Sequence, residues 1–378
     1  MAALSGQRIL LLSYYFPPLA SAGGHRTGAL ARHLSELGAE VTVITVKHGL
    51  DVDDPALLAN LPPAVAVRRV SSLEGAVVRR RLRDRVKHER LKAGESVDRA
   101  TAGSPAEEST EPSGVQRALM ALAWGLSAAR VAQPWALRRA IYGVMALRAV
   151  RREIRRNRPD VVIASLGPMC QSWAALLGAR GSGVPVVLDF RDLWTTAPEY
   201  FTSLRGYAIG RPAYLIDRLT ERWALRRADW FIANHEHMQG SLERLTPRAF
   251  GRVTVIPNGY EEDDFAALPA AGVNRATTDG VVTIRSTGTT YIYTAKSLLD
   301  ACERLPAAAA ARLRIELIGP WYDLVSQLER TERMAVTSVL PPRPHAEALK
   351  AMANADVLLF LLRDMAGIDD MIPARLYE

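Results

Sequence analysis

Short apolar runs alternate with segments of helical periodicity along most of the chain. Seven runs are predicted as strands: residues 8–13, 41–46, 64–70, 161–165, 184–190, 230–233 and 253–256, of which 8–13 has the apolar character of a strand buried on both faces. Helices are predicted between and after them at residues 25–37, 169–180, 212–227 and 236–245. This alternation predicts a parallel, doubly wound α/β sheet.

A second series of the same kind begins at residue 281. It predicts strands at 281–286, 313–318 and 357–362, and helices at 295–304, 323–330 and 345–353, with a last helix starting at 373. Residues 266–280 are rich in Ala, Gly and Thr, which is typical of a linker. The chain of 378 residues is therefore expected to form two α/β domains, 1–265 and 281–378.

One segment of the first domain interrupts this rhythm. Residues 79–92 are strongly basic, and residues 94–114 are rich in Ser, Thr, Glu, Gly and Pro, with almost no large apolar side chain. Such a segment cannot bury enough surface to offset the entropy of ordering, so residues 79–114 are predicted to be a mobile insertion. Residues 115–158 return to a helical pattern.

Composition narrows the classes of partner. A hydrophobic fraction of 48% and a charged fraction of 23% are typical of a globular chain and exclude a wholly disordered or fibrous protein. The formal net charge of +8 suits nucleotides, lipid phosphates or nucleic acid without choosing among them. No nucleic-acid reader motif is present, so nucleic acid is not expected as a partner.

The cysteine content and the N-terminus favour a cytoplasmic protein. Cys170 and Cys302 lie far apart in the sequence and form neither a disulfide framework nor a CxxC motif, which fits a reducing compartment. The apolar run near the N-terminus reads as a buried strand rather than a signal peptide.

A basic helix near residue 150 indicates a possible membrane contact. Its arginines, with aromatic residues upstream, suit an in-plane contact with anionic lipid: Arg148, Arg151, Arg152, Arg155 and Arg156. An ordinary helix with one solvated face explains the same pattern equally well.

Two glycine-containing segments follow predicted strands. In an open α/β sheet, ligands bind beyond the carboxyl ends of the strands, where helix N-termini offer free N–H groups. Gly23 and Gly24 in SAGGH, and Gly288 in STGTTY, would let the backbone approach a phosphate closely. Neither segment is a GxGxxG or Walker motif, and ordinary tight turns account for them equally well.

Several charged residues are candidates for a ligand site. Lys296 and Arg375, each near a predicted helix start, could neutralise a diphosphate or could be solvated surface charges. Asp370 and Glu378 could accept hydrogen bonds from sugar hydroxyls, although acids at this spacing often occur by chance.

The predicted strand 184–190 ends in a charged motif, LDFRDLW. Its charged residues, Asp189, Arg191 and Asp192, are either functional or an Asp–Arg pair that fixes the loop. His235 and His237 stand at i and i+2, a spacing that does not face one side of a helix, so metal binding is not expected there.

An ordered set of motifs resembles glycosyltransferase family 4, with the GT-B fold, near the subgroup that builds bacterial surface polysaccharides. The matching segments occur in family order: YYFPPLASAGGHRTGALARHLSELGAEVTVIT, VVLDFRDLW, VTVIPNGYEEDDF, STGTTYIYTAKSLLDAC, LRIELIG, PHAEALKAMANADVLLFLL and IPARLYE. The resemblance covers nearly the whole chain and is specific for the family rather than for a substrate.

The resemblance implies two Rossmann-like domains facing each other across a cleft. It implies a retaining transferase without metal or other cofactor, which moves a sugar from a nucleotide-sugar donor to a glycan or lipid-linked acceptor at the inner face of the cell membrane. The C-terminal domain would bind the donor and the N-terminal domain the acceptor.

By position, the resemblance also implies roles for individual residues. Donor-binding roles would fall to Gly23, Gly24, Gly288, Lys296, Arg375 and Glu378. Asp192 and Asp370 would act at the reacting sugar, with His25 and Arg191 on the acceptor side.

The sequence departs from the family pattern in places. Asp370 and Arg375 stand where many relatives have Glu and Lys, and Arg191 stands where many have His. Relatives continue beyond the position of Glu378, so an incomplete second domain is expected. A nucleotide-sugar epimerase of the same fold and a non-catalytic nucleotide-binding or scaffold protein are the alternative functions.

Overall fold

The computed structural model describes most of the two predicted α/β series. The described residues are 3–19, 21–47, 54–72, 134–195, 211–266, 268, 280–288, 298, 300–319, 337–341, 343–360, 372 and 374–377. The predicted insertion 79–114, the first part of the helix predicted at 115–158 and the helix predicted at 323–330 lie outside them. The chain divides into unit 1, Met1–Pro257, and unit 2, which begins at Asn258.

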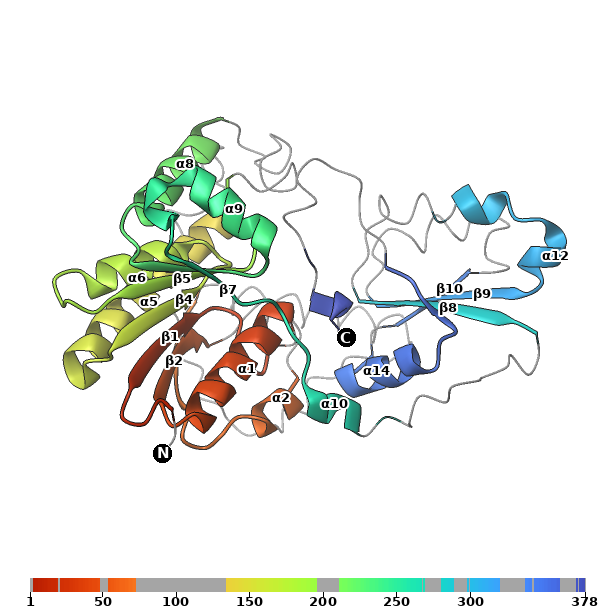
Figure 1. Cartoon of the computed structure of the whole chain (residues 1–378), viewed down its shortest axis with the longest axis horizontal. Coiled ribbons are helices and arrows are strands. Elements are labelled where there is room, and N and C mark those ends of the chain that lie inside the picture. Colours follow the sequence, from red (N-terminus) through yellow and green to blue (C-terminus); the bar gives the residue numbers. More distant parts are fainter. Residues whose placement is uncertain are drawn as a thin grey trace, which may run out of the picture. The chain divides into compact units, whose positions relative to one another are not determined.

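Unit 1 is built on a seven-stranded sheet in the order β3-β2-β1-β4-β5-β6-β7, in which all neighbouring strands are parallel (Figure 1). The strands are β1 (Arg8–Ser13), β2 (Glu40–Val46), β3 (Ala66–Val70), β4 (Val161–Ser165), β5 (Val186–Phe190), β6 (Trp230–Ala233) and β7 (Val253–Val255). The strand order reverses between β1 and β4, as in doubly wound nucleotide-binding folds.

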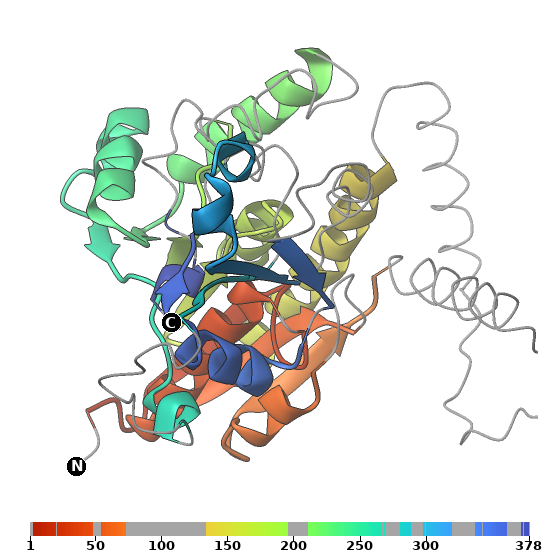
Figure 2. The same cartoon turned by 90° about the vertical axis from the view of Figure 1, so that its right-hand side faces the viewer.

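Helices cover both faces of this sheet (Figures 1 and 2). On one face, α1 (Ala22–Glu36) packs Ala31 against Leu11 and Val43. On the other, Leu10 and Leu12 share a core with residues of α5 (Pro134–Asn157), α6 (Cys170–Ala179), α8 (Arg211–Leu225) and α9 (Glu236–Leu245). Adjacent strand residues face opposite sides, so a strand covered on both must be apolar throughout.

Short elements complete unit 1. These are α2 (Ala56–Ala59) and the 3-10 turn η1 (Pro247–Ala249). Among the described residues, no helix has both the length and the apolar character needed to cross a bilayer.

Unit 2 repeats the same topology on a smaller scale. Its parallel sheet has the order β10-β9-β8-β11, formed by β8 (Val282–Thr287), β9 (Leu313–Ile318), β10 (Thr337–Leu340) and β11 (Val357–Leu358). The helical elements are α10 (Glu262–Ala266), α12 (Ala307–Ala310), α14 (His345–Ala353) and the 3-10 turn η4 (Ala374–Leu376). The prediction of an α/β protein with two Rossmann-like parts is confirmed.

Most predicted elements in the described parts have the expected type, with two kinds of difference. First, α1 begins at Ala22 rather than residue 25, so the two predicted loop glycines lie in its first turn. Second, several short elements were not predicted, because they carry too few residues for a periodic pattern: α2, η1, α10, α12 and β10.

Candidate functional site at the carboxyl edge of the first sheet

The first turn of α1 is held close to the loop that follows β1. Ser21 is the N-cap, and its Oγ accepts a hydrogen bond from Gly24 N at 3.1 Å. A Cβ added at Gly24 would lie 2.1 Å from the carbonyl oxygen of Leu19. Glycine is therefore needed at position 24 because the backbone at Leu19 passes close to the first turn of α1. The sequence predicted instead that Gly24 belongs to a loop before the helix.

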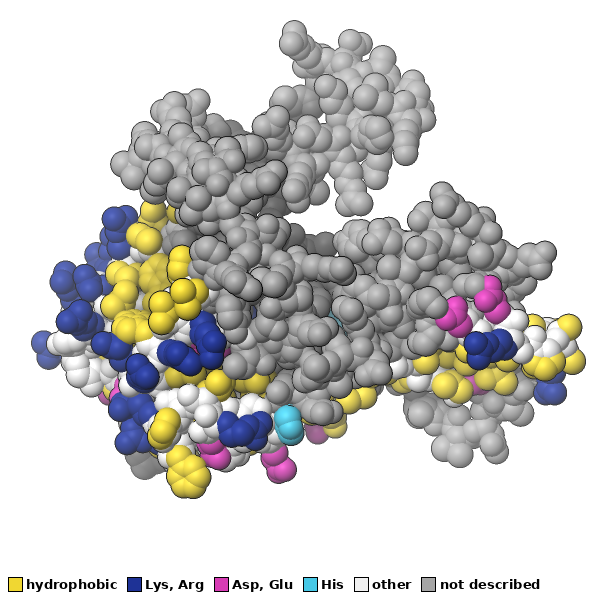
Figure 3. Space-filling view, turned by 90° about the horizontal axis from the view of Figure 1, so that it is seen from above, with side chains coloured by type: hydrophobic (Ala, Val, Ile, Leu, Met, Phe, Trp, Pro, Cys, Tyr) yellow, Lys and Arg dark blue, Asp and Glu magenta, His cyan; other side chains and the backbone are white. Residues whose placement is uncertain are grey.

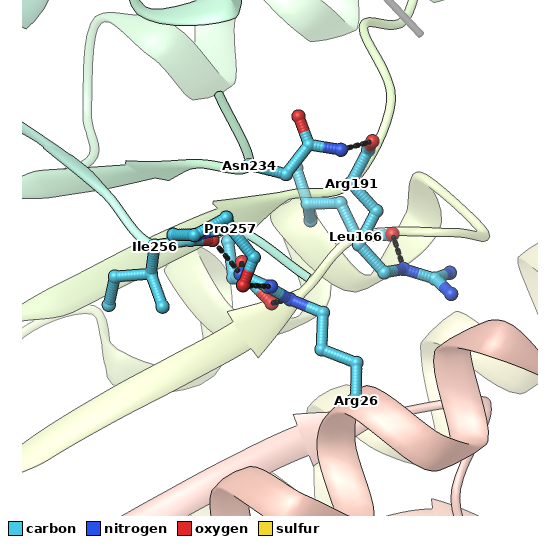
Figure 4. Close-up of polar contacts among 7 residues, drawn as sticks. Arg26, Leu166, Arg191, Asn234, Ile256 and Pro257 are labelled. Atoms are coloured by element: carbon cyan, nitrogen blue, oxygen red, sulfur yellow. Dashed lines mark hydrogen bonds and ion pairs between the residues drawn. The ribbon is translucent and has the colours of Figure 1, made fainter. Parts of the chain in front are cut away.

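Gly23 makes room for a guanidinium group. A Cβ added at Gly23 would lie 1.7 Å from Arg191 Nη1, and one added at Gly167 would lie 2.2 Å from Nη2. Arg191 Nε and Nη2 donate to the carbonyl oxygens of Leu166 and Gly167, each at 2.9 Å, and the group lies 5.0 Å from the ring centroid of Tyr15. Figure 4 shows the bond to Leu166. The structure thus brings Gly23 and Arg191, two predicted site residues, into contact.

A second arginine, Arg26 of α1, connects three parts of unit 1. Its Nη2 lies 2.9 Å from Oδ1 of Asp189, a side chain with no exposed surface. Beyond β7, the same guanidinium donates through Nη2 to the carbonyl oxygen of Ile256 at 2.9 Å and through Nη1 to that of Pro257 at 3.0 Å (Figure 4). One interpretation of the sequence was an Asp–Arg pair that fixes the loop after β5. Asp189 does form such a pair, but its partner is Arg26 of α1 and not Arg191, and the sequence pattern did not indicate Arg26.

Asp192 follows β5 and differs from Asp189 in its surroundings. It is half-buried, and burial raises the pKa of its carboxyl above the ordinary value, while electrostatic interactions with Arg191 and His235 oppose this rise. A carboxyl group with a raised pKa in a partly accessible position is able to exchange a proton with a bound hydroxyl group.

His235, beside Asp192, is the N-cap of α9. Its Nδ1 accepts from Met238 N at 3.2 Å, so a neutral ring carries its proton on Nε2. That Nε2 is buried and has no hydrogen-bond partner among the described residues. His237 stacks at 6.4 Å between ring centroids, so the two rings do approach each other, because His235 precedes the helix.

Other buried polar atoms at the same edge have no hydrogen-bond partner in the described part of the chain. They belong to the last residue of β4, the residue after β6 and the first turn of α6: Ser165 Oγ, Asn234 Oδ1 and Gln171 Oε1. Asn234 is held by a bond from its Nδ2 to the carbonyl oxygen of Arg191 at 2.7 Å (Figure 4). Buried groups of this kind normally have partners, so they mark places where a ligand or water would bind.

The loop after β5 is anchored to α8 by Glu221. This buried carboxylate accepts from Thr195 N at 3.2 Å and from the Thr195 hydroxyl. Burial raises the pKa of Glu221, the bonds from Thr195 and Trp194 oppose the rise, and Asp217 adds to it. Glu221 therefore fixes the position of the segment that carries Asp192.

The remaining predicted residues of unit 1 are His25 and a group of arginines. His25 is half-buried in the first turn of α1. The five arginines predicted to contact lipid are all exposed on α5: Arg148, Arg151, Arg152, Arg155 and Arg156. Arg151 donates to the carbonyl oxygen of Leu177 in α6 at 3.1 Å.

In unit 2, Gly288 follows β8 at the carboxyl edge of the second sheet. It has a φ of 94°, and a Cβ at Gly319, which follows β9, would lie 2.3 Å from its carbonyl oxygen. Ser286 Oγ, two residues earlier, is buried without a partner among the described residues. Lys296, Asp370 and Glu378 lie outside the described residues, as does the side chain of Arg375.

A charged cavity of about 230 Å³ lies in unit 2, and its lining residues are not among the predicted site residues. It is lined by residues of β8, β9 and α14 and of the segment before α14: Arg285, Glu316, Ile318, Arg343, Glu347, Lys350, Ala351 and Asn354. Arg285 is already paired, with its Nε 2.6 Å from Glu316 and its Nη1 bonded to the carbonyl oxygen of Ala351. In the described residues, no three His, Cys, Asp or Glu side chains cluster as metal ligands would.

Comparison with known proteins agrees with this architecture. A sequence model described as Glycosyltransferase Family 4 matches residues 91–264, a stretch that includes β4 to β7. None of the curated protein sequences matches the chain.

The solved structures that resemble this chain include a nucleotide-sugar complex and a glycosyltransferase. The Anabaena protein HepE in complex with UDP-glucose is 14% identical, with a TM-score of 0.53 over 93% of this chain and 72% of its own. A glycosyltransferase from Rickettsia africae is 11% identical, with a TM-score of 0.52 over the same shares. The chain thus has the two-Rossmann-domain GT-B fold and matches a glycosyltransferase family model over part of its length.

Proposed function

We propose that the protein is a retaining glycosyltransferase that moves a sugar from a nucleotide-sugar donor to a glycan or lipid-linked acceptor. The observation that carries the proposal is the position of Asp192. It lies at the carboxyl edge of the first sheet and interacts electrostatically with His235, whose buried Nε2 has no hydrogen-bond partner among the described residues, and burial raises the pKa of its carboxyl group. The family-model match and the GT-B fold support a transferase.

Unit 1 is proposed to bind the acceptor around Asp192. A hydroxyl group of the acceptor donates to the Asp192 carboxylate and accepts from His235 Nε2, while Asn234 Oδ1 accepts from a second hydroxyl. These groups supply both donors and acceptors, as a polyhydroxyl ligand requires. Arg191 and His25 lie on this acceptor side as positioning residues.

Unit 2 is proposed to bind the donor. Gly288 and the Ser286 hydroxyl lie at the carboxyl edge of its sheet, where a diphosphate can meet backbone N–H groups. Lys296, Arg375 and Glu378 remain proposed donor ligands, and Asp370 a proposed contact of the donor sugar. Gly23 and Gly24, in the first turn of α1, would contribute backbone near the diphosphate.

The proposed chemistry needs no metal ion. As the bond between the anomeric carbon and the diphosphate breaks, negative charge develops on the leaving oxygen, and fixed cations and N–H groups stabilise it. The acceptor oxygen then bonds to the anomeric carbon from the face that the diphosphate leaves, and its proton passes to the leaving group or to Asp192.

A transfer assay tests this function. Because HepE was solved with UDP-glucose, UDP-sugars are the first donors to screen, followed by GDP- and ADP-sugars, with polysaccharide and lipid-linked acceptors. We expect release of nucleoside diphosphate that depends on acceptor, and a donor-dependent rise in Tm. Absence of both for every donor would refute the proposal, and a new sugar formed from donor alone would indicate epimerisation instead.

Asp192→Asn tests the site itself. We expect transfer to fall by roughly 10²–10⁴-fold with donor binding retained, because the amide cannot take up a proton. Asp160→Asn is the matched control, since Asp160 is exposed and accepts from Arg8 N at the amino edge of the same sheet. Equal effects of the two substitutions would remove Asp192 from the mechanism.

A peripheral membrane contact through α5 is part of the proposal. The contact would be made by exposed arginines at positions 148, 151, 152, 155 and 156. Among the α5 side chains that the structure describes, Val144 is the only large apolar one that is exposed. Such a contact is electrostatic and weakens with salt. Replacing all five by Gln should therefore reduce cosedimentation with anionic vesicles at low salt, and unchanged cosedimentation would count against it.

A further inference from the structure

Helix α8 carries large apolar side chains on its outer face. Leu215, Ile216 and Leu219 are 55%, 64% and 56% exposed, whereas Ala224 and Leu225 on the inner face are buried in the core. Leu215 and Leu219 are one helical turn apart, and Ile216 adjoins them. Isolated exposed leucines are ordinary, but three large apolar side chains side by side indicate a surface that is covered in use.

Arginines border this apolar face. Arg218 and Arg222 are exposed on α8, and Arg226 and Arg227 follow its last turn, with the Arg227 guanidinium 4.9 Å from the Trp223 ring centroid. In Figure 3, which looks down on the side where α8 lies in Figure 1, hydrophobic and basic surfaces adjoin each other. The acids of the helix are not part of this face, since Glu221 is buried and Asp217 is half-buried.

This combination of groups identifies the chemistry of the partner. Apolar side chains with arginines around them, and no exposed acid from residue 215 to residue 227, match a bilayer surface, where the apolar groups enter the acyl boundary and the arginines meet phosphates. We propose that the outer face of α8, defined by Leu215, Ile216, Leu219, Arg218, Arg222 and Arg226, binds in the plane of an anionic phospholipid bilayer.

The location of α8 connects this surface with the candidate site. Glu221, on the inner face of α8, binds Thr195, three residues after Asp192. A bilayer at the outer face of α8 therefore lies against the helix that anchors the Asp192 loop, which suits an acceptor carried on a lipid. The inference rests on the proposed function, which includes a membrane contact through the arginines of α5. It adds that the apolar side chains that enter the bilayer belong to α8.

Flotation of the 378-residue chain with vesicles of phosphatidylcholine, with and without phosphatidylglycerol, tests the inference. We expect binding to vesicles that contain phosphatidylglycerol, and a loss of roughly tenfold or more for Leu215→Ser/Ile216→Ser/Leu219→Ser. For Arg218→Gln/Arg222→Gln/Arg226→Gln the expected loss is roughly a hundredfold at low salt, since each arginine near an anionic surface contributes about a factor of five. Phe250→Ser, at a residue 78% exposed outside α8, is the control and should bind normally.

A second variant separates insertion from charge attraction. Leu215→Lys/Leu219→Lys adds two positive charges and removes two apolar side chains, so at high salt, where the attraction of charges is screened, binding should weaken if α8 inserts. Stronger binding would overturn the inference, as would an unchanged Ser variant or a stable dimer that the Ser variant abolishes. If only the α5 arginine variant loses binding, the protein contacts the membrane through α5 and the role of α8 is overturned. If the native chain does not bind vesicles, the contacts proposed for α5 and for α8 are both refuted.

Discussion

Asp189 and Asp192 stand three residues apart at the end of one strand, yet their surroundings are opposite. Asp189 has no exposed surface and is bound by Arg26, which also ties the end of β7 to α1. Asp192 is half-buried and burial raises its pKa, while two buried polar atoms at the same edge of the sheet, His235 Nε2 and Asn234 Oδ1, lack partners among the described residues. A buried charge with complete partners stabilises a fold, and incompletely paired polar groups at a strand end indicate a binding site.

The sharpest test of this contrast is one substitution made at both positions. Asp189→Asn leaves the Arg26 guanidinium, 10% exposed, without its counter-ion, so we expect the free energy of unfolding to fall by about 3–5 kcal/mol. Urea denaturation measures the change. A double variant with Arg26→Gln should lose much less than the sum of the single losses; additive losses would mean that the pair is not a unit.

The next largest loss of stability is expected for a substitution of Gly24 in the first turn of α1. Gly24→Ala places a Cβ 2.1 Å from the Leu19 carbonyl, a backbone atom that cannot move alone, and should cost about 1–3 kcal/mol. Gly240→Ala in α9 is the matched control, because its Cβ meets only Arg244 Nη1 at 3.4 Å and alanine favours the helix. Thermal unfolding of both variants checks this, and equal stability would show that the turn accommodates a side chain.

Asp192→Asn should not lower the free energy of unfolding, in contrast to Asp189→Asn. Because burial raises the pKa of Asp192 in the folded state, its stabilising contribution is complete below the unfolded pKa and is lost as the pH rises through the folded pKa. At pH 7 the amide should therefore leave the free energy of unfolding unchanged or raise it by less than about 1 kcal/mol. A loss of several kcal/mol would place Asp192 in the structural class with Asp189.

The smallest effect is expected at Glu221. Its pKa is also raised, so stability conferred by Glu221 is present below the unfolded pKa and declines as the pH rises through the folded value. Glu221→Gln keeps an acceptor for Thr195 and should change stability at pH 7 by less than about 1 kcal/mol while flattening this pH dependence. Urea midpoints measured from pH 4 to pH 8 test it, and parallel pH profiles for the two proteins would contradict the assignment.

The order of strands and helices was accessible from the sequence, because apolar runs and helical periodicity are local. The strands at 8–13, 161–165, 230–233 and 313–318 have the predicted bounds. The start of α1 was predicted three residues late, since glycines normally favour a loop and the cap at Ser21 depends on a contact with Gly24. The pairing of Arg26 with Asp189 spans 163 positions and has no local pattern.

The amino-acid sequence by itself determined the α/β class, the two-part organisation and the strand-end position of Asp192. These follow from which side chains avoid water and from their spacing along the chain. Only the tertiary structure decided which carboxylate is neutralised and which polar atoms lack partners, because the pKa of a carboxyl group depends on charges and burial supplied by distant segments. It also decided that Leu215, Ile216 and Leu219 face outward, since the same apolar residues would be read as core from the sequence.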